Sequence, residues 1–183
     1  MNPKLKAVLR RCREKKFLVE FDRDPRISEC ITGFVVGFSD SLVLLHLLDW
    51  NTFTLNGYIV IREQDITGLS VLGKDSWQSK AARVNKLNPI QPSIALSSIA
   101  DVMVSASKGF PLVAIEKELV ANDKKWIGRL ARLTKKTVVI RGLNPNAVWI
   151  KESKFSLSEI TRVEFGGGYE AALALSARTL RNT

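Results

Sequence analysis

Apolar positions along the chain fall into two series of short runs, and each series is introduced by a segment with helical spacing. Residues 3–16 carry an apolar stripe at intervals of three and four residues, formed by Leu5, Val8, Leu9 and Cys12. Residues 93–108 carry a second such stripe, formed by Ile99, Val102, Met103 and Ala106. Both segments are therefore predicted to be helices. We expect Asn2 and Ser93 to cap them and Gly109 to end the second.

Strand-like runs follow each helix in the same order, from Lys16 in the first series and from Lys108 in the second. Each series has a short apolar run, a polar turn, a glycine (Gly33 or Gly128) and a second apolar run, "LVLLHLL" or "TVVIRGL". Each then ends on a similar motif, "QDITGLSV" or "SEITRVEF". Landmarks that keep their order in this way indicate an internal repeat. Each copy is predicted to contain one helix, about five short strands and a weak helix or tail.

The segment "NKLNPIQPS" contains Pro89 and Pro92 and gives the clearest boundary, so we expect domains at 1–88 and 89–183. Five short strands in so few residues are best accommodated as a small barrel, which removes most exposed strand edges. Glycine in the second strand allows the bending that such a barrel needs, as at Gly33, Gly37 and Gly128. The fold class predicted is mainly β with short helices: two tandem five-stranded small barrels, each preceded by an N-terminal helix.

Two motifs of the first copy resemble those of Sm-like proteins, a family of small SH3-like barrels. "GFVVGFSDSLVLL" (33–45) is similar to the first Sm motif, and "IREQDI" (61–66) to the second, with Arg62 at the arginine position. Glu63 stands at the glycine position and Val43 at that of the RNA-contacting asparagine. The second copy keeps the apolar skeleton of these motifs, and the paired pattern ending in "ITRVEFGGGYEAAL" also resembles uncharacterised bacterial proteins. The resemblance implies tandem Sm-like barrels, with Arg62 as a candidate RNA contact.

Positive charge is the unusual bulk property, with a formal net charge of +10. Residues 124–141 carry seven basic side chains and no acidic one, and residues 1–16 carry seven basic side chains against Glu14. Basic segments of this kind suit a phosphate backbone, although they are also typical of ordinary solvated faces. Trp126 is the aromatic residue expected to stack on bases, whereas Trp149 is expected in the core. The candidate nucleic-acid-binding residues are Lys124, Lys125, Trp126, Arg129, Arg132, Lys135, Lys136, Arg62, Arg10, Arg11 and Arg13.

Residues suited to catalysis or metal binding are few. His46 is the single histidine, and Cys12 and Cys30 are the only cysteines, which gives no recognisable zinc set or disulfide framework. The acids of "EFDRDP" (20–25) alternate with arginine and are interpreted as a solvated turn. The glycine run at 166–168 lacks the lysine of a phosphate loop. We therefore expect no catalysis, no metal and no cofactor.

Partners and location follow from the same features. No run of about twenty apolar residues is present, and the N-terminus has no apolar signal-peptide core, so we expect a cytoplasmic protein without membrane contact. The first hypothesis is a binding protein for RNA or another nucleic acid, without base-specific readout. The alternative is a protein-interaction module, of a bacterial adaptor or immunity type, that binds an acidic partner surface. Barrel edges could also join copies of the chain into a homo-oligomer.

Overall fold

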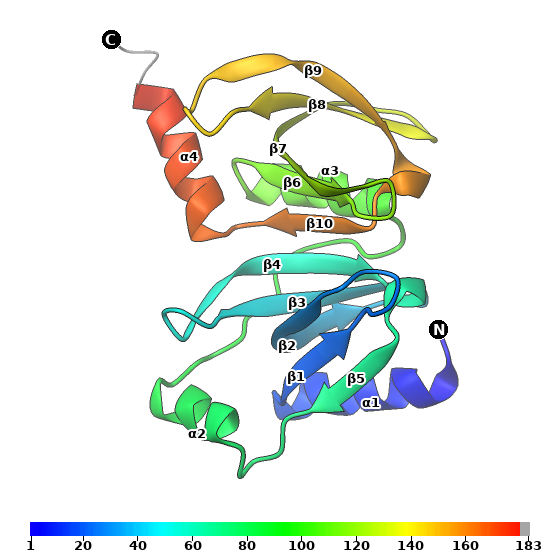
Figure 1. The fold of residues 1–183 in the computed structure, drawn as a ribbon, viewed down its shortest axis with the longest axis vertical. Coiled ribbons are helices and arrows are strands. Elements are labelled where there is room, and N and C mark those ends of the chain that lie inside the picture. The colour runs from blue at the N-terminus through cyan, green and yellow to red at the C-terminus, as the bar shows by residue number, and fades with distance from the viewer. Residues whose placement is uncertain (180–183) are drawn as a thin grey trace. The chain divides into compact units, whose positions relative to one another are not determined.

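A computed structural model describes residues 1–179 of the protein, with side chains for residues 1–177 (Figure 1). The chain divides into two compact units, Met1–Pro92 (unit 1) and Ser93–Thr183 (unit 2). The division lies inside the segment that contains Pro89 and Pro92, a few residues after the boundary expected at 88. The fold is mainly β with short helices, as predicted.

Unit 1 consists of a helix, five strands with a short 3₁₀ turn before the last, and a second helix. Its elements are α1 (Pro3–Lys15), β1 (Leu18–Asp22), β2 (Cys30–Phe38), β3 (Leu42–Asp49), β4 (Thr54–Arg62), η1 (Glu63–Asp65), β5 (Gly68–Val71) and α2 (Trp77–Val84). Unit 2 repeats this succession. Its elements are α3 (Ile99–Gly109), β6 (Val113–Lys117), β7 (Ala121–Leu133), β8 (Thr137–Leu143), β9 (Trp149–Ser156), η2 (Leu157–Glu159), β10 (Arg162–Phe165) and α4 (Gly168–Thr179).

The strand order is the same in the two units. Neighbouring strands pair in the order β5-β1-β2-β3-β4 in unit 1 and β10-β6-β7-β8-β9 in unit 2, and the ladders are antiparallel. Two irregularities in register also recur 95 positions apart: Val35/Gly37 with Leu130/Arg132, and His46/Leu48 with Arg141/Leu143. The structure thus shows open antiparallel sheet in each unit, and closure of each set into a barrel stays a prediction.

The two leading helices begin at side-chain caps, one of them not where the sequence analysis placed it. The side chain of Asn2 accepts a hydrogen bond from the backbone N of Lys4 at 2.9 Å, which confirms the first cap. The expectation for Ser93 is wrong, because α3 begins after Ser98. Ser98 Oγ accepts from the Asp101 backbone N at 3.1 Å and lies 2.7 Å from the Asp101 carboxylate. Ser93 has an apolar residue three positions on and cannot form this reciprocal pair.

Each unit has helices packed on both sides of its strands. In unit 1, Leu9 and Cys12 of α1 join the strand side chains of the main core, whereas Val8, expected in the same stripe, is 38% exposed. The side chain of Ala82 on α2 belongs to a second cluster with Leu18 and Phe34. In unit 2, α3 contacts β6, β7 and β10, and its Val102, Met103 and Ala106 are fully buried. A second cluster there joins α4 to the strands through Leu112, Leu143, Ala147, Leu173, Ala174 and Ala177.

Candidate nucleic-acid interface

A close approach between β7 and β8 places two arginines next to each other on unit 2. Gly128 lies at this point: a Cβ added to it would lie 2.1 Å from the carbonyl oxygen of Arg141. One residue along, Arg129 on β7 stands directly opposite Arg141 on β8. Like charges in opposite positions of an antiparallel ladder repel each other. Neither guanidinium forms an ion pair with a carboxylate of the described side chains. Glu152 on β9 stands opposite Arg141, but its carboxylate pairs with Arg132, so the two guanidiniums remain a local excess of positive charge.

Trp149, the first residue of β9, lies beneath both guanidiniums. The guanidinium carbon of Arg129 is 4.8 Å from the centre of the Trp149 ring, and that of Arg141 is 5.3 Å from it. Cation–π contacts at such distances are attractive and restrict the long arginine side chains. The ring also packs against the cluster under α4, which fixes its own position. Trp149 thus holds two like charges side by side while their N–H groups remain at the surface.

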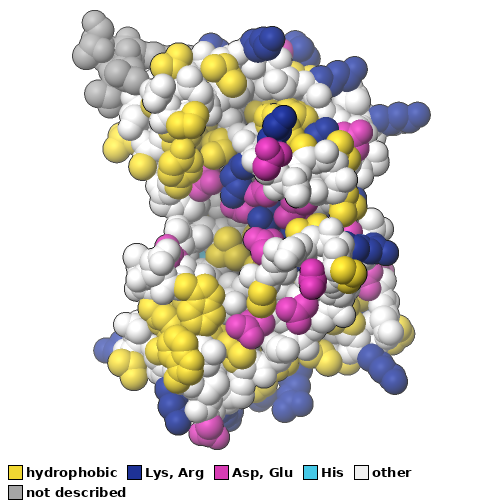
Figure 2. All heavy atoms as spheres, viewed as in Figure 1, with side chains coloured by type: hydrophobic (Ala, Val, Ile, Leu, Met, Phe, Trp, Pro, Cys, Tyr) yellow, Lys and Arg dark blue, Asp and Glu magenta, His cyan; other side chains and the backbone are white. Residues whose placement is uncertain are grey.

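The arginine pair on Trp149 is here called the Arg129–Arg141 face. Further basic side chains lie elsewhere along β7 and β9 and in the turn between β7 and β8. Lys124, Lys135 and Lys136, all predicted candidates, are exposed, as are Lys151 and Lys154 of β9, which the sequence analysis did not select. Arg132, another candidate, is exposed but pairs with Glu152 at 2.6 Å. Figure 2 shows Lys and Arg side chains projecting from the surface formed by β7–β9. The basic run predicted from the sequence therefore lies on β7, β8 and the turn between them, and β9 adds two lysines outside that run.

Two predicted contacts are already neutralised by carboxylates. The ammonium of Lys125 lies 2.7 Å from Glu164 and 3.1 Å from Glu116. Burial lowers its pKa, but these two carboxylates outweigh that effect and raise the pKa of Lys125 overall. Arg62 donates to both oxygens of Asp65, at 2.6 and 3.0 Å, and the Asp65 side chain is fully buried. Breaking either pair would leave a carboxylate without its partner, so we leave Lys125 and Arg62 out of the interface.

Trp126 does not offer a free ring face of the kind expected for base stacking. Its ring centre lies 5.1 Å from that of Phe155, a buried residue, and the Lys117 ammonium lies 5.6 Å from the Trp126 ring. Trp126 faces the strand side opposite to that of Arg129, because the two are three positions apart on β7. Trp126 thus packs inward, whereas Trp149 packs against a core cluster, as expected, and also contacts the two arginines.

The basic helix of unit 1 is only partly available. Arg10 is exposed on α1. Arg11 lies over the ring of Phe17 at 5.9 Å, and Arg13 lies over the ring of Phe38 at 5.5 Å. These contacts use the guanidinium faces inside unit 1 but leave their edges exposed. The helix is therefore a secondary candidate.

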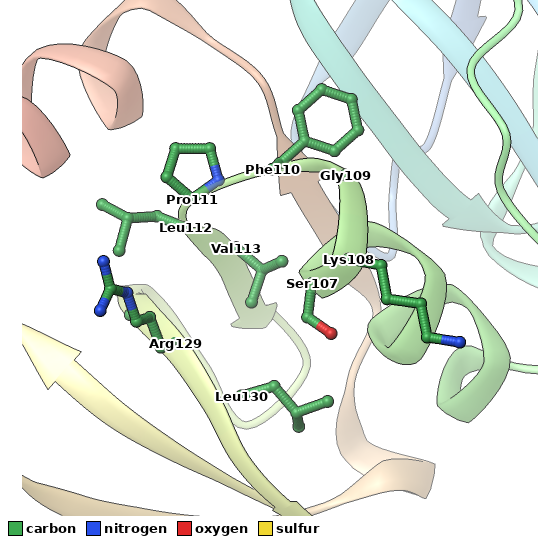
Figure 3. Close-up of a pocket in the computed structure, with 10 residues that line it drawn as sticks. Ser107, Lys108, Gly109, Phe110, Pro111, Leu112, Val113, Arg129 and Leu130 are labelled. Carbon is green, nitrogen blue, oxygen red and sulfur yellow. The ribbon is translucent and has the colours of Figure 1, made fainter.

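A hollow of about 510 Å³ adjoins the Arg129–Arg141 face. It lies between the end of α3, the beginning of β6 and the middle of β7, and Arg129 lines one side of it (Figure 3). Figure 3 shows the Arg129 guanidinium directed towards Leu112 and Pro111, whereas the Lys108 side chain extends away from Arg129. The hollow thus places apolar surface next to one of the two guanidiniums.

His46, Cys12 and Cys30 are the reactive side chains that the sequence analysis singled out. His46 Nδ1 accepts a hydrogen bond from the backbone N of Ile90 at 3.3 Å, its ring stacks on Tyr58, and burial lowers its pKa. Burial raises the pKa of both Cys12 and Cys30, and nearby carboxylates add to the shift at Cys30, so both thiols are disfavoured as thiolates. No group of three or more His, Cys, Asp or Glu among the described residues is arranged to hold a metal ion.

A separate aromatic cluster lies on unit 1. The rings of Trp50, Phe53 and Trp77 lie with their centres 5.8 to 5.9 Å apart. Trp50 is 42% exposed and Trp77 is 63% exposed. Figure 2 shows hydrophobic side chains gathered over this part of unit 1, beside α2. Exposed aromatic groups of this size are a feature of interaction surfaces.

Comparison of the chain with protein-family models, with curated proteins and with solved structures finds no match. Among residues 1–179, no helix combines the length and the apolar character needed to cross a membrane.

Proposed function

We propose that the protein is a non-catalytic nucleic-acid-binding protein that holds the phosphate backbone on the Arg129–Arg141 face of unit 2. The observation that carries this proposal is the pair of opposed arginines on Trp149, neither of which has a carboxylate partner among the described side chains. A bound phosphate relieves the repulsion between the two guanidiniums and accepts hydrogen bonds from both. Arginine is well suited to this role because its planar fork matches phosphate oxygens.

We propose in addition that each unit is a Sm-like small barrel and that the chain is a tandem repeat. The shared strand order and the irregularities that recur 95 positions apart support a duplicated unit. The close strand approaches at Gly33 and Gly128 support strong bending of the second strand in both copies. In unit 1 the positions of Arg129 and Arg141 are taken by Phe34 and His46, so the proposed phosphate contacts belong to unit 2 alone.

Recognition of this kind is independent of base sequence. The cationic groups on the face are proposed to contact phosphate oxygens, and phosphate contacts carry no direct sequence information. Affinity should therefore fall steeply with salt, as cations displaced from the nucleic acid return at high ionic strength. Single-stranded RNA and DNA of mixed sequence are expected to bind with similar affinity.

The test is fluorescence anisotropy with labelled 20-nucleotide RNA and DNA across a salt series. Wild type is compared with Arg129→Gln/Arg141→Gln and with the control Lys80→Gln/Lys86→Gln, which removes the same charge from exposed positions of unit 1. Loss of two phosphate contacts should lower the magnitude of the log–log salt slope by about 1.4. Absence of binding at low salt, or equal effects of the two double variants, would show that this function is wrong.

A second candidate function is protein interaction, which the exposed cluster of Trp50, Phe53 and Trp77 favours. Tryptophan is enriched among the residues that dominate binding energy at protein interfaces. A partner recovered from native lysate by the wild type, retained after nuclease treatment and lost on Trp50→Ser/Trp77→Ser would support it. Recovery of the same partner by the variant would argue against it.

A further inference from the structure

A second hollow lies in unit 1, at the place that corresponds to the hollow beside Arg129. Its volume is about 210 Å³, and it lies between the end of α1, the beginning of β1, β2 and the inner side of α2. Phe17, Leu18 and Phe34 line it at positions that correspond, 95 residues later, to Leu112, Val113 and Arg129 of the other hollow. Both units therefore have a hollow here, but its lining differs.

The floor of the unit 1 hollow is apolar. It is formed by side chains from β1 and the residue before it, from β2, from the segment after β5, and from α2 and the segment after it: Phe17, Leu18, Phe34, Leu72, Ala82 and Leu87. A volume of about 210 Å³ is below the range of roughly 300–1,000 Å³ typical of sites for drug-sized ligands. The floor thus suits one compact, flat ring.

The rim of the hollow carries four cations: Lys15, Lys16, Lys74 and Arg83. None of these four pairs with a carboxylate of the described side chains. Their acidic sequence neighbours, Glu14 and Asp75, do not line the hollow. Lys15 and Lys16 also suit the negative end of the α1 dipole, and Arg83 suits that of α2, so this explanation leaves out only Lys74.

Two of these cations are held in position by hydrogen bonds. Lys16 Nζ donates to the Asn88 side-chain oxygen at 2.7 Å, and Arg83 Nη2 donates to the Lys74 carbonyl oxygen at 2.8 Å. Each keeps further N–H groups that these bonds do not use. The rim is therefore partly organised before any ligand arrives, which lowers the entropy lost on binding.

We propose that this hollow binds a phosphomonoester that carries a flat ring, with the chemistry of a nucleoside monophosphate. A phosphomonoester carries about 1.5 to 2 negative charges at pH 7, which matches a rim of four cations better than a single carboxylate does. The ring lies on the Phe17–Phe34 floor, and the phosphate lies among Lys16, Lys74 and Arg83. A free nucleotide and the phosphorylated end of a strand share this chemistry. The site does not rest on the Arg129–Arg141 face.

The experiment is isothermal titration calorimetry of the full chain with AMP, adenosine and inorganic phosphate. We expect one saturable AMP site with an affinity of about 1 mM or better, and weaker binding of adenosine and of phosphate. Arg83→Glu and Lys74→Glu should each weaken AMP binding about tenfold or more, since each replaces a charge-assisted contact by repulsion. Lys80→Glu is the matched control, because Lys80 lies on α2 but does not line the hollow. The Lys80→Glu variant should bind AMP with the affinity of the wild type.

Three results would overturn the proposal: no saturable AMP binding, equal affinities of Arg83→Glu and Lys80→Glu, or equal affinities for AMP and inorganic phosphate. The source of the ligand is decided by a trinucleotide with and without a 5′-phosphate. Tighter binding of the phosphorylated trinucleotide than of AMP identifies a strand end, and the reverse identifies a free nucleotide. The Arg129→Gln/Arg141→Gln variant should bind AMP as the wild type does, so this site and the unit 2 face can fail independently.

Discussion

Gly128→Ala tests the close approach of β7 and β8 that positions the Arg129–Arg141 face. A Cβ at residue 128 would lie 2.1 Å from the Arg141 carbonyl oxygen, 2.7 Å from a methyl carbon of Ile140 and 2.8 Å from the Arg141 carbonyl carbon. Ordinary van der Waals contact begins near 3.4 Å, so the two strands must separate by roughly 1.3 Å. Two of these atoms belong to the backbone, so a rotamer change cannot relieve the clash.

Forcing a methyl group into such a contact costs about 1–3 kcal/mol of unfolding free energy. For a unit of this size, each kcal/mol corresponds to a fall in Tm of about 4–8 °C. The measurement is urea and thermal denaturation followed by circular dichroism. Gly109→Ala is the matched control, because Gly109 ends α3 in the same unit and a Cβ there meets nothing within 4 Å. It should leave stability unchanged or raise it by up to about 1 kcal/mol. If Gly128→Ala unfolds at the same temperature as Gly109→Ala, the close approach is not a constraint on the fold.

Three further substitutions test other features. Arg62→Met leaves the buried Asp65 carboxylate without its main partner and should lower the unfolding free energy, measured in urea, by about 3–5 kcal/mol. The double variant Arg62→Met/Asp65→Leu should recover most of this stability. Equal losses in the single and double variants would contradict the pairing. Thr161→Val removes a hydroxyl that donates to the Glu118 carboxylate at 2.6 Å and accepts from the Glu118 backbone N. The unfolding free energy should fall by about 1–3 kcal/mol. Thr67→Val, at an exposed position, is the control and should change it less. Burial lowers the pKa of His46 from 6.5, so on acidification the unfolded chain binds this proton before the folded chain does. The unfolding free energy should therefore fall as pH drops below about 6.5, and His46→Asn should remove this contribution. An unchanged pH profile in His46→Asn would refute the prediction.

The elements of the fold were largely predictable because local patterns decide them. Strands β3 and β8 begin at Leu42 and Thr137, where the apolar runs begin. The buried face of α3 follows directly from its spacing. The start of α3 was not predictable in this way, because serine at either 93 or 98 could cap a helix. Only the pair of hydrogen bonds between Ser98 and Asp101 distinguishes the two positions.

The sequence predicted that the candidate site is basic, but not which residues form it. The basic run of 124–141 correctly indicates where positive charge collects. It does not indicate that Lys125 meets two carboxylates from other strands, or that Trp149 lies under Arg129 and Arg141. These partners come from β6, β9 and β10, and lie between 8 and 39 residues away in sequence. Strand register brings them together, and no local pattern encodes it.

The sequence by itself determined the order of helices and strands, the positions of the close-approach glycines and the excess of positive charge. Each of these depends on short-range properties: side-chain periodicity, the absence of a Cβ, and formal charge. Tertiary structure alone decided which charges are neutralised and which stay unpaired. That outcome depends on distances of a few ångströms between strands, because an ion pair or a cation–π contact forms only when both partners meet at that range.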